Sequence, residues 1–267
     1  MTFKALAIDL DGTLLIGEDL SQENKTAVRA AHDAGLEIII ATARWRQMAE
    51  RIAAEIGIQK PIIACSGAQV YLPDSQQDIF NHRIPHDVLS EIYAVCNDQR
   101  CIATISLDKD IVIKLDGKPA SGVLPSDLIW VPKLDVASHP QARIAAIQGS
   151  KIVDFIKSEI YPKHQDKINL YDSIGPSGKI VITITAKKAS KGEALLVCCE
   201  HLGIDPLSVV AYGDAENDIE MFKVSGASVA MGQADQFVKD AATTVTASNE
   251  EHGVAQSIMK LLQTGQP

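Results

Sequence analysis

The sequence predicts an α/β protein with a mostly parallel sheet, into which a second domain of α+β type is inserted. Apolar runs of strand length alternate with helical patterns near both ends of the chain, and this alternation is typical of parallel βαβ units. Between the two ends, the pattern changes to hairpin-like strand pairs mixed with helices. We therefore expect one core domain from residues 1–82 and 188–267, with an inserted domain at 83–187.

The N-terminal part of the core is expected to hold three buried strands. One opens at Ala5, and the others span residues 36–41 and 61–65; each is an apolar run that ends in small polar residues. A helix that begins after Ser21, a suitable N-cap, and a second helix at 45–56 separate these strands. Ligands bind at the carboxyl ends of strands in open α/β sheets, so the polar residues there are candidates for a site.

The remaining elements are expected in two groups. In the inserted domain, the predicted elements are helices at 86–98 and 151–160, hairpin strands at 101–107 and 111–115, and strands at 142–147, 168–171 and 179–185. The tract 116–140 is rich in Pro, Gly and Ser, which predicts loops, with Trp130 as its one large anchor. In the returning core, we expect helices at 190–201, 215–223 and 251–262, and strands at 207–212, 227–231 and 243–245.

The composition is that of an ordinary globular protein and disfavours two classes of partner. The chain of 267 residues carries 34 acidic and 25 basic side chains, which gives a formal charge of −9. This balance disfavours binding to the nucleic-acid backbone, and no dense run of Lys or Arg indicates a basic patch. No apolar stretch approaches the roughly 18 residues of a membrane span, and the N-terminal apolar run is too short for a signal peptide.

The cysteines indicate a reducing compartment. They stand at positions 65, 96, 101, 198 and 199, an odd number without the spacing of a metal site. Cys198 and Cys199, adjacent on a predicted helix, are expected to be buried small apolar side chains. We therefore expect a cytoplasmic protein, and nothing in the sequence indicates an obligate protein partner.

The first strand ends in two carboxylates, a glycine and a threonine. Asp9 and Asp11 are two residues apart, so in a continuing strand their side chains point the same way. Two like charges held close together are costly unless a cation lies between them or one stays protonated. A hard divalent ion such as Mg²⁺ suits these oxygen ligands, and Gly12 allows a sharp turn that presents N–H groups to an anion. The pattern indicates phosphoryl transfer, with one Asp as nucleophile and the other handling a proton; the plainer alternative is a strand followed by a turn.

Three further segments lie at predicted strand ends or helix starts, where a phosphate can be held. They are Thr42-Ala43-Arg44, Ser190-Lys191-Gly192 and Gly213-Asp214-Ala215-Glu216-Asn217-Asp218. Asp214 and Asp218 are four residues apart, one helical turn, which would let both face the same ion. Lys191 near a helix N-terminus is unfavourable with the helix dipole, which favours a role beyond solvation.

Taken together and in this order, these motifs resemble the haloacid-dehalogenase (HAD) superfamily of Mg²⁺-dependent phosphotransferases, and more narrowly its Cof-type, type IIB hydrolases. The resemblance covers the whole chain and includes Val229-Ala230-Met231-Gly232 and Gly253-Val254-Ala255. It implies a Rossmann-like core with an inserted α+β cap that closes over the substrate. It also implies a phosphoric monoester hydrolase, a Mg²⁺-dependent phosphatase of small phosphorylated metabolites, with sugar phosphates as the expected class.

Carried over by position, the resemblance implies a role for each motif residue. Asp9 would attack phosphorus and form an aspartyl-phosphate, while Asp11 would protonate the leaving oxygen and then take a proton from water. Lys191 would act as a positive charge on the transition state. The implied Mg²⁺ ligands are Asp9, the Asp11 backbone carbonyl, Asp214 and, directly or through water, Asp218. The groups expected to bind phosphate are Gly12, Thr42, the Ala43 N–H, Lys191 and Asn217, which either contacts phosphate or orients Lys191.

Several of these residues also have a plainer reading. Thr42 is of a type common at helix N-caps, and Asp218 would suit a helix surface. Arg44 either reaches the phosphate or substrate, or pairs with an acid. Two positions depart from the family pattern, Ala43 in place of Gly and Ser66 in place of Asn. Alanine supplies the same N–H unless the turn requires a positive φ, whereas Ser66, a candidate substrate contact, bears on substrate choice.

Two other functions remain open from the same motifs. A phosphomannomutase-like enzyme would transfer the phosphoryl group to a second sugar hydroxyl, and a requirement for a sugar bisphosphate would reveal it. A non-catalytic regulator that binds a metal or a phosphometabolite is the alternative from another class, and the presence of all the reactive residues argues against it. The sequence of the inserted domain does not identify the leaving group.

Overall fold

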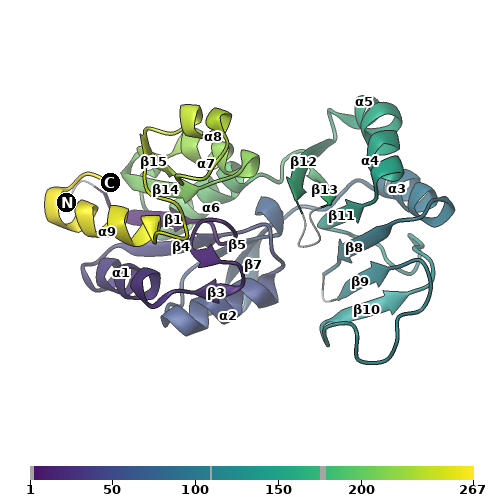
Figure 1. Ribbon diagram of the computed structural model, residues 1–267, viewed down its shortest axis with the longest axis horizontal. Coiled ribbons are helices and arrows are strands. Elements are labelled where there is room, and N and C mark those ends of the chain that lie inside the picture. Colours follow the sequence, from purple (N-terminus) through teal and green to yellow (C-terminus); the bar gives the residue numbers. More distant parts are fainter. Residues whose placement is uncertain (1–2, 109, 175–178) are drawn as a thin grey trace. The chain divides into compact units, whose positions relative to one another are not determined.

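The computed structural model describes residues 3–108, 110–174 and 179–267, and the chain divides into two compact units (Figure 1). Unit 1 combines Met1–Phe80 with Ser190–Pro267, and unit 2 is Asn81–Ala189. Unit 1 has a mostly parallel sheet with helices on both faces, and unit 2 mixes helices with a mostly antiparallel sheet. The predicted fold class, an α/β core with an α+β insert, is confirmed.

Unit 1 is built on a sheet with the strand order β16-β15-β14-β1-β4-β5-β6-β7. These strands are β1 (Ala5–Ile8), β4 (Glu37–Ala41), β5 (Ile62–Ala64), β6 (Gln69–Leu72), β7 (Gln77–Asn81), β14 (Val209–Gly213), β15 (Ala227–Ala230) and β16 (Thr244–Val245). The strands from β16 to β5 pair in parallel, and β6 then pairs antiparallel with β5. Because β1 lies between β14 and β4, the residues that follow these three strands meet at one edge of the sheet.

Helices cover both faces of this sheet. They are α1 (Gln22–Asp33), α2 (Arg46–Ile56), α6 (Lys191–Leu202), α7 (Ile219–Val224), α8 (Gln236–Ala241) and α9 (Gly253–Thr264). Helices α6 to α8 pack on the face that carries Ala5 and Ala7, and α1, α2 and α9 lie on the opposite face (Figure 1). As predicted, the Ser21 side chain caps α1 by accepting a hydrogen bond from the Asn24 N–H at 3.2 Å, and Gly57 ends α2 with a φ of 86°.

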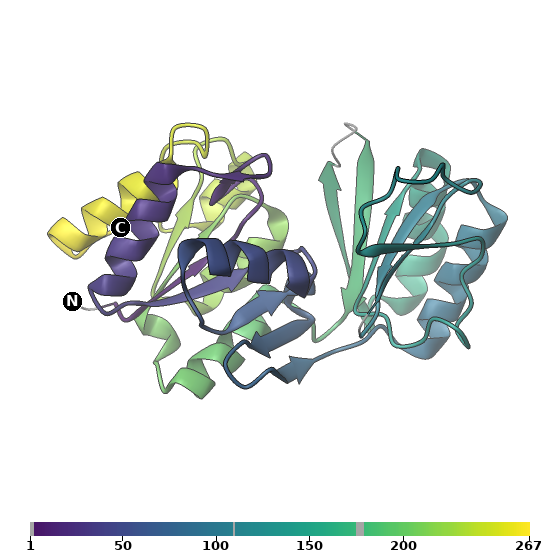
Figure 2. The same ribbon diagram turned by 90° about the horizontal axis from the view of Figure 1, so that it is seen from below.

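Unit 2 has a sheet with the strand order β10-β9-β8-β11-β13-β12, and its helices lie on one face of that sheet (Figure 2). The strands are β8 (Ile102–Ser106), β9 (Ile111–Lys114), β10 (Leu128–Val131), β11 (Ile144–Gln148), β12 (Ile168–Ile174) and β13 (Ile180–Ala186). The helices are α3 (His86–Asp98), α4 (Ser150–Phe155) and α5 (Tyr161–His164), with the π-helical turn Ile156–Ile160 between α4 and α5.

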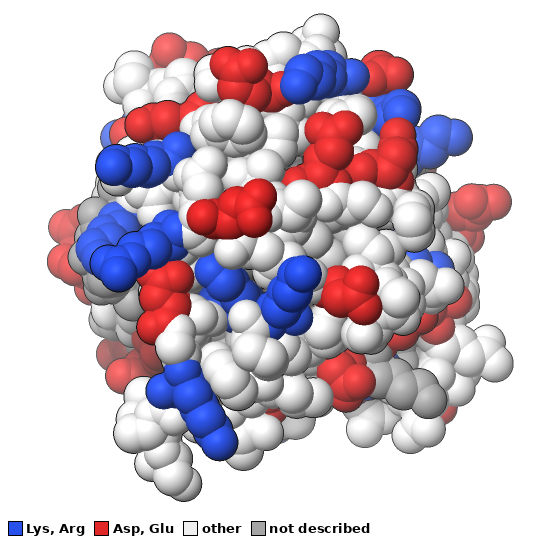
Figure 3. All heavy atoms as spheres, turned by 90° about the vertical axis from the view of Figure 1, so that its right-hand side faces the viewer, with Lys and Arg blue, Asp and Glu red and all other residues white. Residues whose placement is uncertain are grey.

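On the face drawn in Figure 3, acidic and basic side chains are interspersed, so that face carries no field of a single sign.

The structure corrects the sequence prediction at several short elements. The expected helix at 151–160 is interrupted by the π-helical turn, and the loop-rich tract 116–140 contains β10, in which Trp130 is half-buried. β10 pairs in parallel with β9, so no hairpin pattern marks it in the sequence. β6, β7, α8 and the two-stranded ribbon of β2 (Leu15–Ile16) and β3 (Asp19–Leu20) were also not expected. Lys109, in the expected hairpin loop, lies outside the described residues, and within the described chain every helix is too short or too polar to cross a bilayer.

Candidate active site

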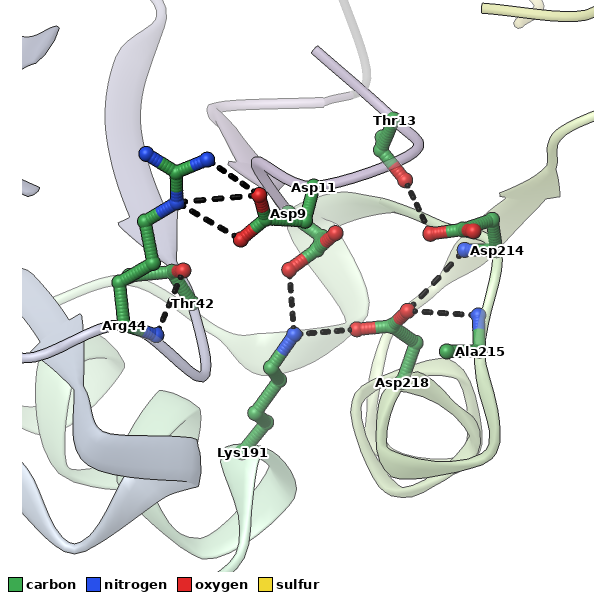
Figure 4. Close-up of polar contacts among 9 residues, drawn as sticks. All are labelled: Asp9, Asp11, Thr13, Thr42, Arg44, Lys191, Asp214, Ala215 and Asp218. Atoms are coloured by element: carbon green, nitrogen blue, oxygen red, sulfur yellow. Dashed lines mark hydrogen bonds and ion pairs between the residues drawn. The ribbon is translucent and has the colours of Figure 1, made fainter. Parts of the chain in front are cut away.

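The loops after β1, β4 and β14 and the start of α6 bring most of the predicted site residues together at one edge of the unit 1 sheet (Figure 4). The residues shown there are Asp9, Asp11, Thr13, Thr42, Arg44, Lys191, Asp214, Ala215 and Asp218. They come from segments that are far apart in the sequence, and parallel pairing of β1 with β14 and β4 places them at the same edge. Polar residues therefore gather where ligands bind in open α/β sheets.

Lys191 is the centre of a buried ion-pair network. It is the first residue of α6, its side chain is 1% exposed, and its Nζ lies 2.6 Å from an oxygen of Asp9 and 2.6 Å from an oxygen of Asp218. Burial alone would lower the pKa of Lys191, but the charges of Asp218 and Asp9 outweigh this effect and raise it. Lys191 therefore stays a cation, in contact with two buried carboxylates.

Asp218 is fully buried, so the alternative of a helix-surface residue is wrong. Its Oδ1 accepts from Lys191, and its Oδ2 accepts hydrogen bonds from the backbone N–H groups of Asp214 and Ala215, each at 3.0 Å. The sequence predicted that Asp218 and Asp214 come together because they lie one helical turn apart, and this explanation is also wrong. Asp214 stands in the loop after β14, outside any helix, and Asp218 ends the 3₁₀ turn Glu216–Asp218. The side chain of Asp218 folds back onto the loop, and this contact joins the two residues.

Asp9, Asp214 and Asp218 form a cluster of carboxylates that could hold a metal ion. Each offers an oxygen, and these three oxygens lie within 4.8 Å of one another. A Cβ on Gly12, whose φ is 77°, would lie 2.3 Å from Oδ2 of Asp214, so glycine is required beside the cluster. Hard divalent cations prefer several oxygen ligands in this arrangement, so the donor set fits such an ion.

Burial and mutual repulsion act on the carboxyl groups of this cluster. Burial raises the pKa of Asp9 well above its usual value; Lys191 opposes the shift, and the charges of Asp218 and Asp214 add to it. Burial, and then the charge of Asp218, raise the pKa of Asp214 to about 7, although a hydrogen bond of 3.0 Å donated by Thr13 Oγ1 opposes this shift. A cation bound among these groups would relieve the repulsion.

Asp11 and Asp9 have different partners, and the strand that was expected to align them ends at Ile8. The Asp11 side chain is 52% exposed and turns toward Arg44, whose Nε donates to both carboxylate oxygens at 3.0 and 2.8 Å (Figure 4). Arg44 Nη1 also donates to Glu18, at 2.8 Å. Of the two alternatives for Arg44, the structure therefore has it paired with acids. Hydrogen bonding to Asp11 raises the pKa of Arg44, which stays a cation.

The loop after β4 is held by backbone contacts. Thr42 is fully buried; its N–H donates to the Ile63 carbonyl at 2.9 Å, and its Oγ1 accepts from the Arg44 N–H at 3.0 Å. Thr42 is not the N-cap of the next helix, since α2 begins at Arg46. Ala43 is not among the residues with a positive φ, so alanine fits this loop without backbone strain.

A strained turn that the sequence did not predict supports this loop. Cys65, Ser66 and Gly67, which follow β5, have φ angles of 56°, 52° and 87°. The N–H groups of Cys65 and Ser66 donate to the carbonyls of Arg44 and Thr42, at 2.8 and 3.1 Å. A Cβ on Gly67 would lie 2.2 Å from the Ser190 carbonyl oxygen, so the turn also packs directly against the start of α6. Two non-glycine residues in the left-handed region leave no signal in the sequence.

Two predicted site residues carry buried polar atoms without a partner. Ser66 is buried, and its Oγ has no hydrogen-bond partner among the described residues. Oδ1 of Asn217, in the turn beside Asp218, is likewise buried without a partner in the described part of the chain. Of the two roles expected for Asn217, the contact that would orient Lys191 is not formed among the described residues, where Asp9 and Asp218 hold the Lys191 ammonium.

The comparison with protein families agrees with this arrangement. A family model described as haloacid dehalogenase-like hydrolase matches residues 6–258. The chain belongs to this family. Among curated proteins, this HAD hydrolase is 28% identical to phosphatase YwpJ of Bacillus subtilis, over 97% of this chain and 100% of that protein. It is 29% identical to the 5-amino-6-(5-phospho-D-ribitylamino)uracil phosphatase YcsE of Bacillus subtilis, over 96% and 94%. It is 26% identical to a phosphoglycolate phosphatase of Methanobrevibacter smithii, over 98% of this chain and 100% of that protein.

Solved structures agree with the fold. A haloacid dehalogenase-like hydrolase from Bacillus subtilis has a TM-score of 0.82 at 25% identity, over 97% of this chain and 99% of that chain. A HAD subclass IIB sugar phosphatase has a TM-score of 0.80 at 24% identity, over 98% and 99%. The predicted family, a Cof-type HAD hydrolase, is therefore confirmed, and the protein is a phosphoric monoester hydrolase.

Proposed function

We propose that this HAD phosphatase hydrolyses small phosphorylated metabolites, with sugar phosphates as the expected class, through a phosphoryl group carried on Asp9 and with Mg²⁺ as cofactor. The observation that carries the proposal is the buried network of Asp9, Lys191 and Asp218, with Asp214 beside it. It joins a fixed carboxylate, a fixed cation and spare oxygen ligands within one site.

Asp9 is the proposed nucleophile. Its carboxylate is buried and held by Lys191, so it has one orientation and little hydration to lose when it attacks. In the first step, an Asp9 oxygen bonds to phosphorus as the bond between phosphorus and the ester oxygen breaks. In the second step, water attacks phosphorus, inorganic phosphate forms, and the Asp9 carboxylate is released. The ammonium of Lys191 offsets negative charge on Asp9 and on the phosphoryl oxygens in both steps.

Asp11 is the proposed acid and base. Unlike Asp9 it is half exposed, so its carboxyl group can meet both a leaving group and water. It would donate a proton to the departing oxygen and take one from the attacking water. Arg44 acts here as a positioning residue, because its three hydrogen bonds, two from Nε and one from Nη2, hold the Asp11 carboxylate in one orientation.

The residues at the site fit a divalent cation. Asp9, Asp214 and the backbone carbonyl of Asp11 would hold Mg²⁺, and Asp218 would act through water, because both of its oxygens already accept hydrogen bonds from the protein. When bound, Mg²⁺ would offset the clustered negative charge and polarise the phosphoryl group. Burial, and then the charge of Asp218, raise the pKa of Asp214 to about 7, and a bound cation would offset both effects.

The experiment is phosphate release from a panel of about a hundred phosphorylated metabolites with Mg²⁺, for the wild type, Asp9→Asn and Asp33→Asn. The panel includes phosphoglycolate and 5-amino-6-(5-phospho-D-ribitylamino)uracil, which the names of two relatives give as their substrates. We expect sugar phosphates among the compounds hydrolysed. Asp9→Asn should lower kcat at least about 1,000-fold without changing the fold, because an amide is a poor nucleophile. Asp33, exposed at the end of α1, is the matched control and should retain full activity.

Two outcomes would contradict the proposal. Retention of more than a few per cent of the rate in Asp9→Asn would remove Asp9 from the role of nucleophile. An absence of release from every compound, small aryl phosphates included, would contradict the phosphatase assignment, and phosphoryl transfer that requires a sugar bisphosphate would replace it with a mutase.

A further inference from the structure

Unit 2 contains a buried lysine that is separate from the proposed active site. Lys114, the last residue of β9, is 6% exposed. Its Nζ lies 3.2 Å from the Gln99 carbonyl oxygen, 3.5 Å from an oxygen of Asp116 and 3.8 Å from Sγ of Cys101. The Asp116 side chain is 47% exposed, so much of its charge is screened by water. A buried ammonium needs a nearby negative or strongly polar group, and a Cys101 thiolate would supply one in the interior.

A second thiol lies next to Cys101. Cys101 immediately precedes β8, and its Sγ donates a hydrogen bond to the Cys96 carbonyl at 3.4 Å. Cys96 is fully buried in the last turn of α3. The chain reverses between α3 and β8, and this reversal brings the two cysteines together. The two side chains and Lys114 therefore form a cluster of two sulfur nucleophiles and one cation.

The two thiols differ in acidity. A hydrogen bond from the Cys96 side chain lowers the pKa of Cys101 to about 7; burial opposes this shift and the charge of Lys114 adds to it. The same contact, and then burial, raise the pKa of Cys96. Cys101 is the thiol next to the Lys114 ammonium and the more exposed of the two, so it is the one that ionises more readily. Since the thiolate is the nucleophilic form, Cys101 should react first.

We propose that Cys96 and Cys101 form a redox-sensitive dithiol, in which Cys101 is the thiol that is oxidised and Cys96 the thiol that resolves it. The oxidant class is a hydroperoxide. The Cys101 sulfur attacks the terminal peroxide oxygen, the O–O bond breaks, and the products are a Cys101 sulfenic acid and an alcohol or water. The Cys96 sulfur then attacks the Cys101 sulfur, the S–O bond breaks, and the thiol proton leaves with the hydroxyl group as water. In total, two thiols lose two electrons and the peroxide gains them.

Cys101 is the more exposed of the two thiols, and its neighbour Arg100 lines a hollow at the surface. Cys101 is 5% exposed, and the hollow, of about 880 Å³, is also lined by Gly149. The disulfide would connect the last turn of α3 to the start of β8, entirely within unit 2.

Peptide mapping after peroxide treatment tests the proposal on the full-length reduced protein. Remaining thiols are blocked with an alkylating reagent, and the protein is digested with trypsin without reductant. Because Arg100 lies between the two cysteines, trypsin separates them, and a disulfide appears as two linked peptides. We expect the link between Cys96 and Cys101 to form first, with Cys198 and Cys199 still free to be alkylated. Cys96→Ser should leave Cys101 as a sulfenic acid that dimedone traps.

The Lys114 variants test the role of the cation. At pH 7, Lys114→Met should slow alkylation of Cys101 about tenfold, because loss of the positive charge lowers the thiolate fraction. Lys114→Arg keeps the charge and should retain most of the rate, and Lys118→Met, exposed in the following loop, should retain all of it. The proposal is wrong if no link forms between Cys96 and Cys101, if Cys198 or Cys199 is oxidised first, or if Lys114→Met alkylates at the wild-type rate. These readouts do not depend on phosphate release, so they stand or fall separately from the proposed function.

Discussion

Among the described residues, two lysines are buried, one in each unit, and their partners differ. Lys191 in unit 1 contacts two buried carboxylates, each at 2.6 Å, that come from sequence positions far from its own. Lys114 in unit 2 contacts a carbonyl, a half-exposed acid and a thiol, all within about fifteen residues of it. A parallel sheet gathers distant side chains at the ends of its strands, whereas a hairpin mostly joins neighbours in sequence. The difference explains why unit 1 holds a dense charge network and unit 2 a small thiol cluster.

The largest expected effect comes from removing each lysine in turn. Lys191→Met leaves Asp9 and Asp218 buried without their counter-charge, which should lower the free energy of unfolding by about 3–5 kcal/mol. It should also lower kcat at least about 100-fold, because a cation at the phosphoryl group is lost. Lys114→Met removes weaker contacts, so it should lower the free energy of unfolding by about 1 kcal/mol and leave kcat unchanged. Urea unfolding and phosphate release on both variants measure this contrast, and equal losses in the two variants would contradict it.

An intermediate effect is expected from the metal and from pH. EDTA should abolish phosphate release and Mg²⁺ should restore it; full activity in the chelator would rule out the metal assignment.

Asp214 has a folded-state pKa of about 7 against 3.8 for an ordinary Asp, so the folded protein binds more protons between these values. The free energy of unfolding of the metal-free protein should therefore fall as pH rises from 3.8 to about 7.

Asp214→Asn isolates this contribution to stability. In EDTA at pH 8, the variant should be more stable than the wild type, by on the order of 1–3 kcal/mol, because a charge that is buried and repelled by Asp218 is gone. At pH 4 the difference should vanish, since Asp214 is then protonated in the fold. Thermal unfolding across pH, with and without Mg²⁺, measures both effects, and only the wild type should gain stability from the ion. A variant that is no more stable than the wild type in EDTA at pH 8 would show that neither burial nor the charge of Asp218 destabilises the Asp214 carboxylate.

The smallest expected effect separates a glycine that supports the site from one that only ends a helix. Gly67→Ala should displace the start of α6, because its Cβ would lie 2.2 Å from the Ser190 carbonyl oxygen, and lower kcat about tenfold. Gly203→Ala meets nothing within 4 Å, so its φ of 64° should cost only about 1 kcal/mol of stability and leave kcat unchanged. Comparing kcat at equal fractions folded distinguishes the two, and similar kcat values would show that the turn at 65–67 does not position Lys191.

The sequence by itself determined the alternation of strands and helices, the cap of α1 at Ser21, the end of α2 at Gly57 and the position of each reactive motif at a strand end or helix start. These features follow from local rules, namely hydrophobic periodicity, capping side chains and glycine φ angles, which act over a few residues. The family resemblance rested on the same motifs, and the match of the family model over residues 6–258 confirmed it.

Only the tertiary structure decided the contacts of the charged groups. Asp11 turned toward Arg44, Asp218 folded onto the loop at 214–215, and the left-handed turn at 65–67 packed against α6. Each of these contacts joins segments that neither periodicity nor a motif relates to one another. The energy of a buried charge depends on which groups lie within a few ångströms, and only the packed chain sets those distances. The motifs identified the candidate site residues, but the packing of the chain determined which groups they contact.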